Sequence, residues 1–132
     1  LLNAKEVGMS EWEASANGTD PAIDLIPKDI IICDWHYGLA ERYRSIGVFI
    51  DKGFRVWPSS WKDLGPSLAL VRDAKRYQSP LMIGHLNTTW ISGPELYRAI
   101  LQEGDPAEWT ELAKQTAESL RACMKEINAP ER

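Results

Sequence analysis

The sequence has little cysteine, no glycine-rich phosphate loop and no long apolar run. Only two cysteines occur in 132 residues, Cys33 and Cys123, and their spacing fits neither a metal site nor a disulfide framework. Gly-x-Gly-x-x-Gly and Gly-x-x-x-x-Gly-Lys-Ser/Thr are both missing, so we predict no nucleotide loop and no cofactor. No apolar stretch approaches the roughly 20 residues of a membrane helix, and we therefore expect no membrane span.

An excess of positive charge is also missing. The formal net charge is -4, the isoelectric point is near 5.2, and the basic residues form no stripe, so nucleic acid is not an expected partner. A content of 44% hydrophobic and 26% charged residues is typical of one soluble domain with a real core. Residues 1–6 lack the two parts of a signal peptide, and no location is predicted.

Three short apolar runs dominate what is present. Each ends in aromatic and polar residues and then gives way to a helix-like segment. The runs cover residues 29–37, 54–61 and 80–90, and their starts lie 25 and 26 residues apart. One strand, one helix and two loops fill that distance, so the sequence predicts consecutive β/α units that form a parallel sheet.

The chain divides into an irregular lead-in over 1–26, three strand units over 27–104 and a terminal helix within 105–132. Unbroken isoleucine at 30–32 predicts a strand covered on both faces and therefore central in its sheet. A single apolar stripe predicts a helix over about 39–52. Gly53 then stands where a left-handed cap is favoured.

A further helix is predicted to begin near Pro66 and return the chain to the third strand. A short helix is expected from Gly93 and Pro94, and Gly104 ends it. A longer helix over about 107–127 is expected to cover the last strand.

Three parallel strands are a poor structure by themselves, because both edges expose unpaired backbone. We therefore predict an α/β fold in which the chain supplies the last three β/α units, about strands 6 to 8, of a TIM (β/α)8 barrel that is incomplete in this chain. A small doubly wound domain is the alternative. That fold usually has about five strands and a switch point, and the sequence offers three convincing strands.

Side chains just after the carboxyl ends of such strands line the rim where barrels bind ligands. Indole faces match the apolar C–H faces of a sugar ring, and neighbouring polar groups can bind its hydroxyls. The sequence therefore predicts a ligand-binding rim whose tryptophans are suited to stacking on sugars, and no metal. The candidate substrate-binding residues are Asp34, Trp35, His36, Tyr37, Trp57, Trp61, Asn87 and Trp90.

Other roles remain open for several of these residues. Trp35 and Trp90 could fill the core, Trp57 and Trp61 could fix a loop beside Pro58, and Tyr37 could merely begin the helix. Asp34 and His36 could bond to each other rather than to a sugar. Thr88 and Thr89 are expected to support the backbone at the strand end, and Trp12 and Trp109 to pack.

Asp34, His36 and His85 carry a separate metal hypothesis, because carboxylate and imidazole suit zinc or iron. A metal-dependent hydrolase requires the three side chains to converge within about 5 Å of one point, since metal bonds are near 2 Å long.

Four motifs resemble, in order, the carboxyl-terminal half of glycoside hydrolase family 20 catalytic domains, the β-N-acetylhexosaminidase-like barrels. The motifs lie at residues 11–15, 26–37, 53–61 and 84–90, and the resemblance extends over about 1–103. It implies retaining hydrolysis of terminal N-acetylhexosamine sugars, in which the acetamido oxygen of the substrate attacks the anomeric carbon. The resemblance also implies that Trp35 and Trp90 belong to an aromatic cage around the acetamido methyl group.

The family's catalytic Asp-Glu pair follows the fourth strand, and no residue of this chain corresponds to it. No catalytic residue is therefore assigned, and we expect a glycosidase only at full length, the chain alone being inactive. The expected partners are a small saccharide or glycoconjugate and the missing amino-terminal half of the barrel. Pro58 and Ser92 stand in regions where the family often has Tyr-x-Asp and Glu, which leaves the sugar undetermined. The main alternative is a non-catalytic carbohydrate-binding barrel relative.

Overall fold

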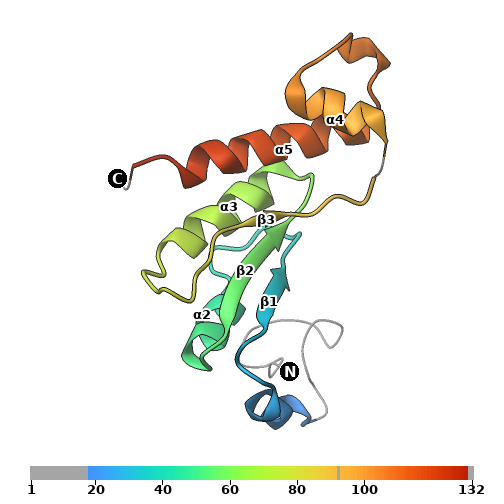
Figure 1. Cartoon of the computed structure of the whole chain (residues 1–132). Helices are drawn as coiled ribbons and strands as arrows, with labels where there is room; N and C mark the ends of the chain where they lie inside the picture. Colours follow the sequence, from blue (N-terminus) through green and yellow to red (C-terminus); the bar gives the residue numbers. More distant parts are fainter. Residues whose placement is uncertain (1–17, 92, 131–132) are drawn as a thin grey trace.

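The structure is a computed structural model that describes residues 18–91 and 93–130, in which helices flank a small parallel sheet (Figure 1). Residues 11–15 of the first motif, Trp12 among them, and Ser92 lie outside the described residues. The elements are η1 (Asp20–Leu25), β1 (Ile31–Trp35), α2 (Arg44–Asp51), β2 (Arg55–Ser60), α3 (Leu64–Lys75), β3 (Leu86–Asn87), α4 (Pro94–Leu101), η2 (Pro106–Glu108) and α5 (Glu111–Ile127). The α/β class and the parallel strands are confirmed.

The sheet has the order β1-β2-β3, so the strands follow one another in space as they do in sequence. Ile31 of β1 pairs with Arg55 of β2, and the register continues to the pair Trp35–Ser59. The prediction that the isoleucine run forms a central strand is wrong, because β2 occupies the centre of the described sheet and β1 an edge. The run is continuously apolar, but only one of its faces receives helical cover.

The third strand is shorter than the sequence predicted. Val56 forms an isolated bridge with Met82, and regular pairing resumes only at Ser59 with Leu86. Between these two pairings β2 has two residues, 57 and 58, and the other segment has three, 83 to 85, which is the geometry of a bulge.

Pro58 gives the bulge a physical reason. The Val56 N–H donates to the carbonyl of Leu81, so the nitrogen two residues later points to the same side, and a proline there has no hydrogen to donate. Gly84 supplies the positive φ of +126° that the detour uses.

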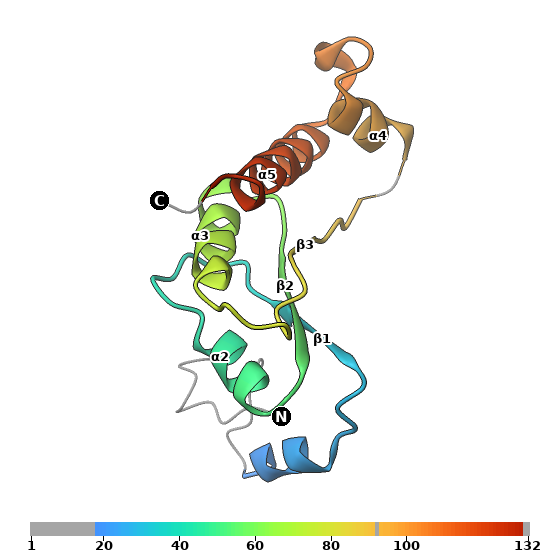
Figure 2. The same ribbon diagram turned by 60° about the vertical axis from the view of Figure 1, so that its left-hand side comes forward.

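Helices α2 and α3 lie on the same side of β1 and β2 (Figure 2). Helix α2 begins at Arg44, later than the predicted 39, because Tyr43 holds the preceding loop. The Tyr43 N–H donates to Asp73 Oδ2 at 2.8 Å, and its hydroxyl donates to the Gly38 carbonyl at 2.9 Å. The left-handed glycine after the helix is confirmed, with Gly53 at φ +82°.

The core lies between the sheet and these two helices, where Ile46, Phe54, Val56, Leu70 and Val71 are essentially inaccessible to solvent. Helix α5 packs on α3 and α4 rather than chiefly on the last strand. It begins after Thr110, whose Oγ1 accepts the Ala113 N–H at 3.3 Å.

The short helix after Gly93 is confirmed as α4, and Trp109 packs against Ala99 and its neighbours as expected. Cys123 is buried on α5, whereas Cys33 is exposed on β1. No helix in the described part of the chain is long and apolar enough to cross a membrane.

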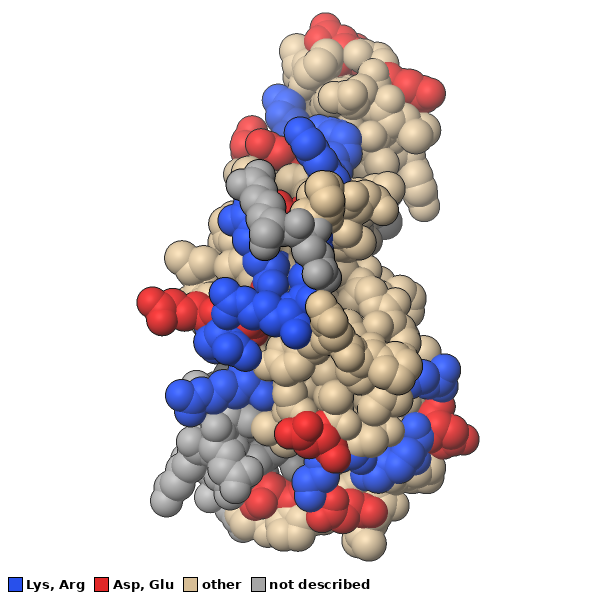
Figure 3. Space-filling view, turned by 90° about the vertical axis from the view of Figure 1, so that its left-hand side faces the viewer, with Lys and Arg blue, Asp and Glu red and all other residues tan. Residues whose placement is uncertain are grey.

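Lys and Arg side chains gather in a band on the helical side of the molecule (Figure 3), so the expectation that the basic residues form no stripe is wrong. Some of them line a pocket of about 680 Å³ between the ends of α3 and α5. Arg72 donates to both carboxylate oxygens of Glu126 at 3.1 Å, and Lys75 donates to the carbonyls of Glu126 and Ala129. These contacts fasten α5 to α3.

Candidate functional site

The two faces of the sheet have different surroundings. Residues that pair across parallel strands point to the same side, and successive residues alternate between sides. The side chains of Ile32, Asp34, Val56, Pro58 and Ser60 point toward the helices, and we call this the covered face. The other side we call the open face; it carries Ile31, Cys33, Trp35, Arg55, Trp57 and Ser59.

Aromatic side chains from three strand ends meet at one end of the open face. The Trp35 and Trp90 rings stand perpendicular to each other with centroids 5.5 Å apart. Tyr37 lies nearly parallel to Trp35 at 6.5 Å and tilted to Trp61 at 5.8 Å. We call Trp35, Tyr37, Trp61 and Trp90 the rim cluster.

The rim cluster is accessible. Trp35 is 51% exposed and Trp90 is 56% exposed, although large aromatic side chains are usually among the most buried in a domain. Adjacent exposed aromatic rings of this kind are a candidate surface for a ligand or a partner. The structure thus brings together four of the eight candidate residues.

Trp57 shares the open face but lies outside the rim cluster. It pairs with Cys33 in the middle of the strands, two residues before Ser59, which is the partner of Trp35. Its ring nitrogen lies beside the detour at Gly84, and the side chain is partly buried.

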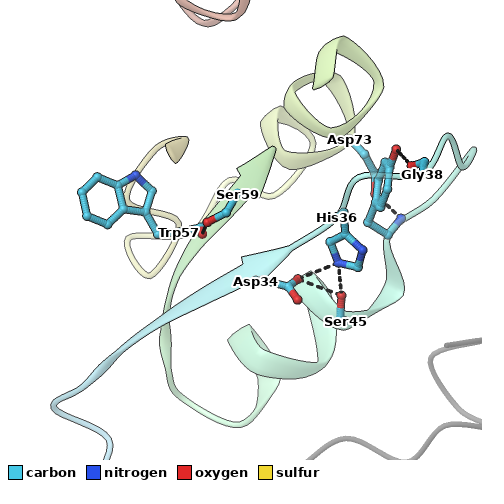
Figure 4. Close-up of polar contacts among 8 residues, drawn as sticks. Asp34, His36, Gly38, Ser45, Trp57, Ser59 and Asp73 are labelled. Atoms are coloured by element: carbon cyan, nitrogen blue, oxygen red, sulfur yellow. Dashed lines mark hydrogen bonds and ion pairs between the residues drawn. The ribbon is translucent and has the colours of Figure 1, made fainter. Parts of the chain in front are cut away.

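Asp34 and His36 lie on the covered face, opposite Trp57 (Figure 4). Asp34 is buried; its Oδ2 accepts from Ser45 Oγ at 2.7 Å and lies 3.1 Å from His36 Nε2 in an ion-pair contact. His36 Nε2 also lies 2.7 Å from Ser45 Oγ. The alternative in which Asp34 and His36 bond to each other is therefore the one observed, and the trio fastens the start of α2 to the end of β1.

Asn87 also turns toward the helices. Its amide nitrogen donates to Ser60 Oγ, to the Trp61 carbonyl and to Ser119 Oγ at 3.2 to 3.3 Å. Ser119, on α5, donates to the same Trp61 carbonyl at 2.6 Å. This network holds the loop after β2 against α5, so Asn87 supports Trp61 from behind.

His85 belongs to the same buried region, with Nε2 2.8 Å from Ser60 Oγ. Burial lowers its pKa from 6.5 to about 4, because desolvation disfavours the imidazolium.

The metal hypothesis for Asp34, His36 and His85 is not supported by the geometry. His36 and Asp34 bond to Ser45, whereas His85 bonds to Ser60. No group of three or more His, Cys, Asp or Glu side chains that could hold a metal ion occurs within residues 18–91 and 93–130.

Two residues of the rim were not among the sequence-based candidates. Thr88 and Ser60 connect the strand ends: the Thr88 N–H and hydroxyl both donate to the Ser60 carbonyl, at 2.8 and 2.7 Å. Thr88 thus supports the strand-end backbone, as predicted. Its hydroxyl also meets that of Tyr37 at 3.1 Å, a contact between residues 51 positions apart that no local pattern could indicate.

Comparison with known proteins adds no assignment: no family model matches the sequence, and a search of curated proteins gave no significant match.

Proposed function

We propose that this chain forms the aromatic side of a sugar pocket in a glycoside hydrolase of the family 20 type, which acts on terminal N-acetylhexosamine sugars by substrate-assisted retaining hydrolysis. The observation that carries the proposal is the rim cluster: Trp35, Tyr37, Trp61 and Trp90 come from three separate strand ends and meet at one accessible place. Perpendicular indoles offer two apolar walls, which suit a pyranose face or an acetamido methyl group.

The barrel part of the proposal is supported by the way the sheet is built. The order β1-β2-β3 never reverses, and α2 and α3 lie on one side. A doubly wound sheet reverses its order and carries helices on both sides, whereas in a barrel all helices lie outside and the other face lines the interior. The exposed apolar residues of the open face, Ile31 and Trp35 among them, fit an interior that further strands would close.

The chemistry of the open face is consistent with a binding role and no catalytic role for this chain. Asp34, the carboxylate at the end of β1, is buried among hydrogen bonds on the covered face. The Asp-Glu pair that the family resemblance requires would come from strands outside these residues. Without that pair, the same rim cluster would serve a non-catalytic sugar-binding relative, and the presence or absence of the Asp-Glu pair distinguishes the two.

The test is binding of N-acetylglucosamine to a full-length version that contains these 132 residues, measured by saturation-transfer NMR. We expect transfer to the acetamido methyl and ring C–H protons, and we expect Trp90→Ala to weaken binding by about 1–3 kcal/mol, the contribution of one large apolar side chain. Tyr97→Ala is the matched control, since Tyr97 is an aromatic residue 66% exposed on α4.

The alternative outcomes are distinct. No transfer to the sugar in the parent chain contradicts the binding role of the rim cluster. Transfer that Trp90→Ala leaves unchanged shows that Trp90 is scaffold and that the sugar binds elsewhere.

A further inference from the structure

One chain of hydrogen bonds connects all three strand ends through the rim cluster. The Trp90 indole N–H donates to the Tyr37 hydroxyl at 2.9 Å. The Tyr37 hydroxyl lies 3.1 Å from Thr88 Oγ1, and the Thr88 hydroxyl donates to the Ser60 carbonyl at 2.7 Å. Residues after β1, at the end of β2 and after β3 are thereby joined.

The direction of each hydrogen bond follows from the first donor and the last acceptor of the series. The indole nitrogen can only donate and the carbonyl can only accept. Thr88 gives its proton to the Ser60 carbonyl, so its oxygen accepts from Tyr37. Tyr37 consequently gives its own proton to Thr88 and accepts the proton of Trp90, and the hydroxyl has no proton left for a ligand.

Tyr37 also touches the remaining aromatic residues. Its ring centroid lies 6.5 Å from that of Trp35, in a stacked arrangement, and 5.8 Å from that of Trp61, in a tilted one. It is the one member of the rim cluster with described contacts to all three others. Trp90, by contrast, is 56% exposed, so the bond to Tyr37 and the edge contact with Trp35 define its orientation.

We infer that Tyr37 is a positioning residue, which holds the Trp90 indole perpendicular to Trp35 before any ligand arrives. A preset ring avoids the entropy that an exposed side chain would lose on binding. The role of that ring in sugar recognition rests on the proposed function, whereas the positioning of Trp90 by Tyr37 does not.

The experiment compares Tyr37→Phe, which removes only the hydroxyl, with Thr88→Val, which keeps Tyr37 and cuts the next bond. Tyr97→Phe is the control, because it makes the same chemical change on α4. The first readout is the indole ¹H–¹⁵N signal of Trp90 in the full 132-residue chain, identified as the one that Trp90→Phe removes. A bonded indole proton exchanges slowly with water, so we expect Tyr37→Phe to shift this signal and speed its exchange by about tenfold.

Thr88→Val is expected to shift the same signal less, and Tyr97→Phe to leave it in place. If circular dichroism shows that Tyr37→Phe does not fold, the shift of the Trp90 signal in Thr88→Val tests the inference instead. A Trp90 signal that neither variant moves overturns the inference.

The second readout is the affinity for N-acetylglucosamine. We expect Tyr37→Phe to weaken it by about 3- to 10-fold, the scale of ordering one long side chain, and Trp90→Ala to weaken it more. A shifted Trp90 signal with unchanged affinity overturns the role of positioning in recognition. A shifted signal in a parent chain that binds no sugar supports the positioning and contradicts the proposed function.

Discussion

The covered and open faces of the sheet are formed by the same strands but differ in burial. On the covered face, Val56 and Ser60 are fully buried and Asp34 nearly so. On the open face, Ile31, Cys33 and Trp35 alternate with them and are exposed. Stability should therefore depend mainly on the covered face, and the proposed sugar recognition on the open one.

The polar groups of the two faces differ in the same way. Asp34, His36 and Asn87 were expected to contact a ligand, yet their hydrogen bonds go to α2 and α5. Aromatic rings, rather than charges, remain at the exposed rim. Residue type suggested ligand contact for all of these residues, but the face on which each residue lies separates support from contact.

Among substitutions that compare the two faces, Phe54→Ala is expected to cause the largest loss in the free energy of unfolding. Phe54 is fully buried against Ile23 and Phe49, so its removal leaves a cavity and should lower the free energy of unfolding by about 3–5 kcal/mol. Trp35→Ala removes a larger ring from the open face and should cost less than about 1.5 kcal/mol, since about half of that ring is already in water. Urea denaturation measures both, and equal losses would break the distinction between the faces.

Asp34→Ala is expected to have the next largest effect. It leaves the Ser45 hydroxyl without its buried acceptor, removes the ion-pair contact of His36 and should lower the free energy of unfolding by about 2–4 kcal/mol. Ser45→Ala is the matched variant and should cost about half as much. If Asp34→Ala instead keeps full stability and abolishes binding of N-acetylglucosamine, Asp34 is a ligand contact and its assignment to support is wrong.

His85 gives the smallest effect, and it depends on pH. Its folded-state pKa of about 4 lies below the ordinary 6.5, so below pH 6.5 the unfolded chain takes up a proton that the folded chain does not. The stability that depends on a neutral His85 is fully present above pH 6.5 and is lost as the pH falls toward 4. The free energy of unfolding should fall by about 2 kcal/mol between pH 7 and pH 4.5.

His85→Gln should remove this part of the pH dependence, because glutamine does not titrate in this range. Urea denaturation at the two pH values measures the loss in both proteins. If the free energy of unfolding changes equally with pH in the parent and the variant, His85 is more solvated than the covered face would allow.

Much of the architecture follows from local patterns. The alternation of strands and helices, the positive φ of Gly53 and the short helix after Gly93 were all predicted, because turn residues and apolar spacing act over a few residues. The later start of α2 was not, since it depends on the contact of Tyr43 with Asp73, 30 residues away. The split of β3 could have been suspected from Pro58, which has no N–H for a neighbouring strand.

The candidate site was predictable in position but not in arrangement. Strand-end placement brought Trp35, Tyr37, Trp61 and Trp90 to one rim, while Trp57 stayed lower on the open face. The support residues Ser45, Ser60 and Thr88 have no distinguishing pattern, because their importance comes from hydrogen bonds between distant segments.

The sequence by itself determined the order of the elements and the placement of aromatic residues at the strand ends, because strand length, turn residues and helix periodicity are local properties. Tertiary structure alone decided which alternate side chains meet helices and which point away from them, since α2 and α3 cover a single side of the sheet. It also decided that Trp90 meets Tyr37, 53 residues earlier. That contact exists only because parallel pairing brings the carboxyl ends of the strands to one edge.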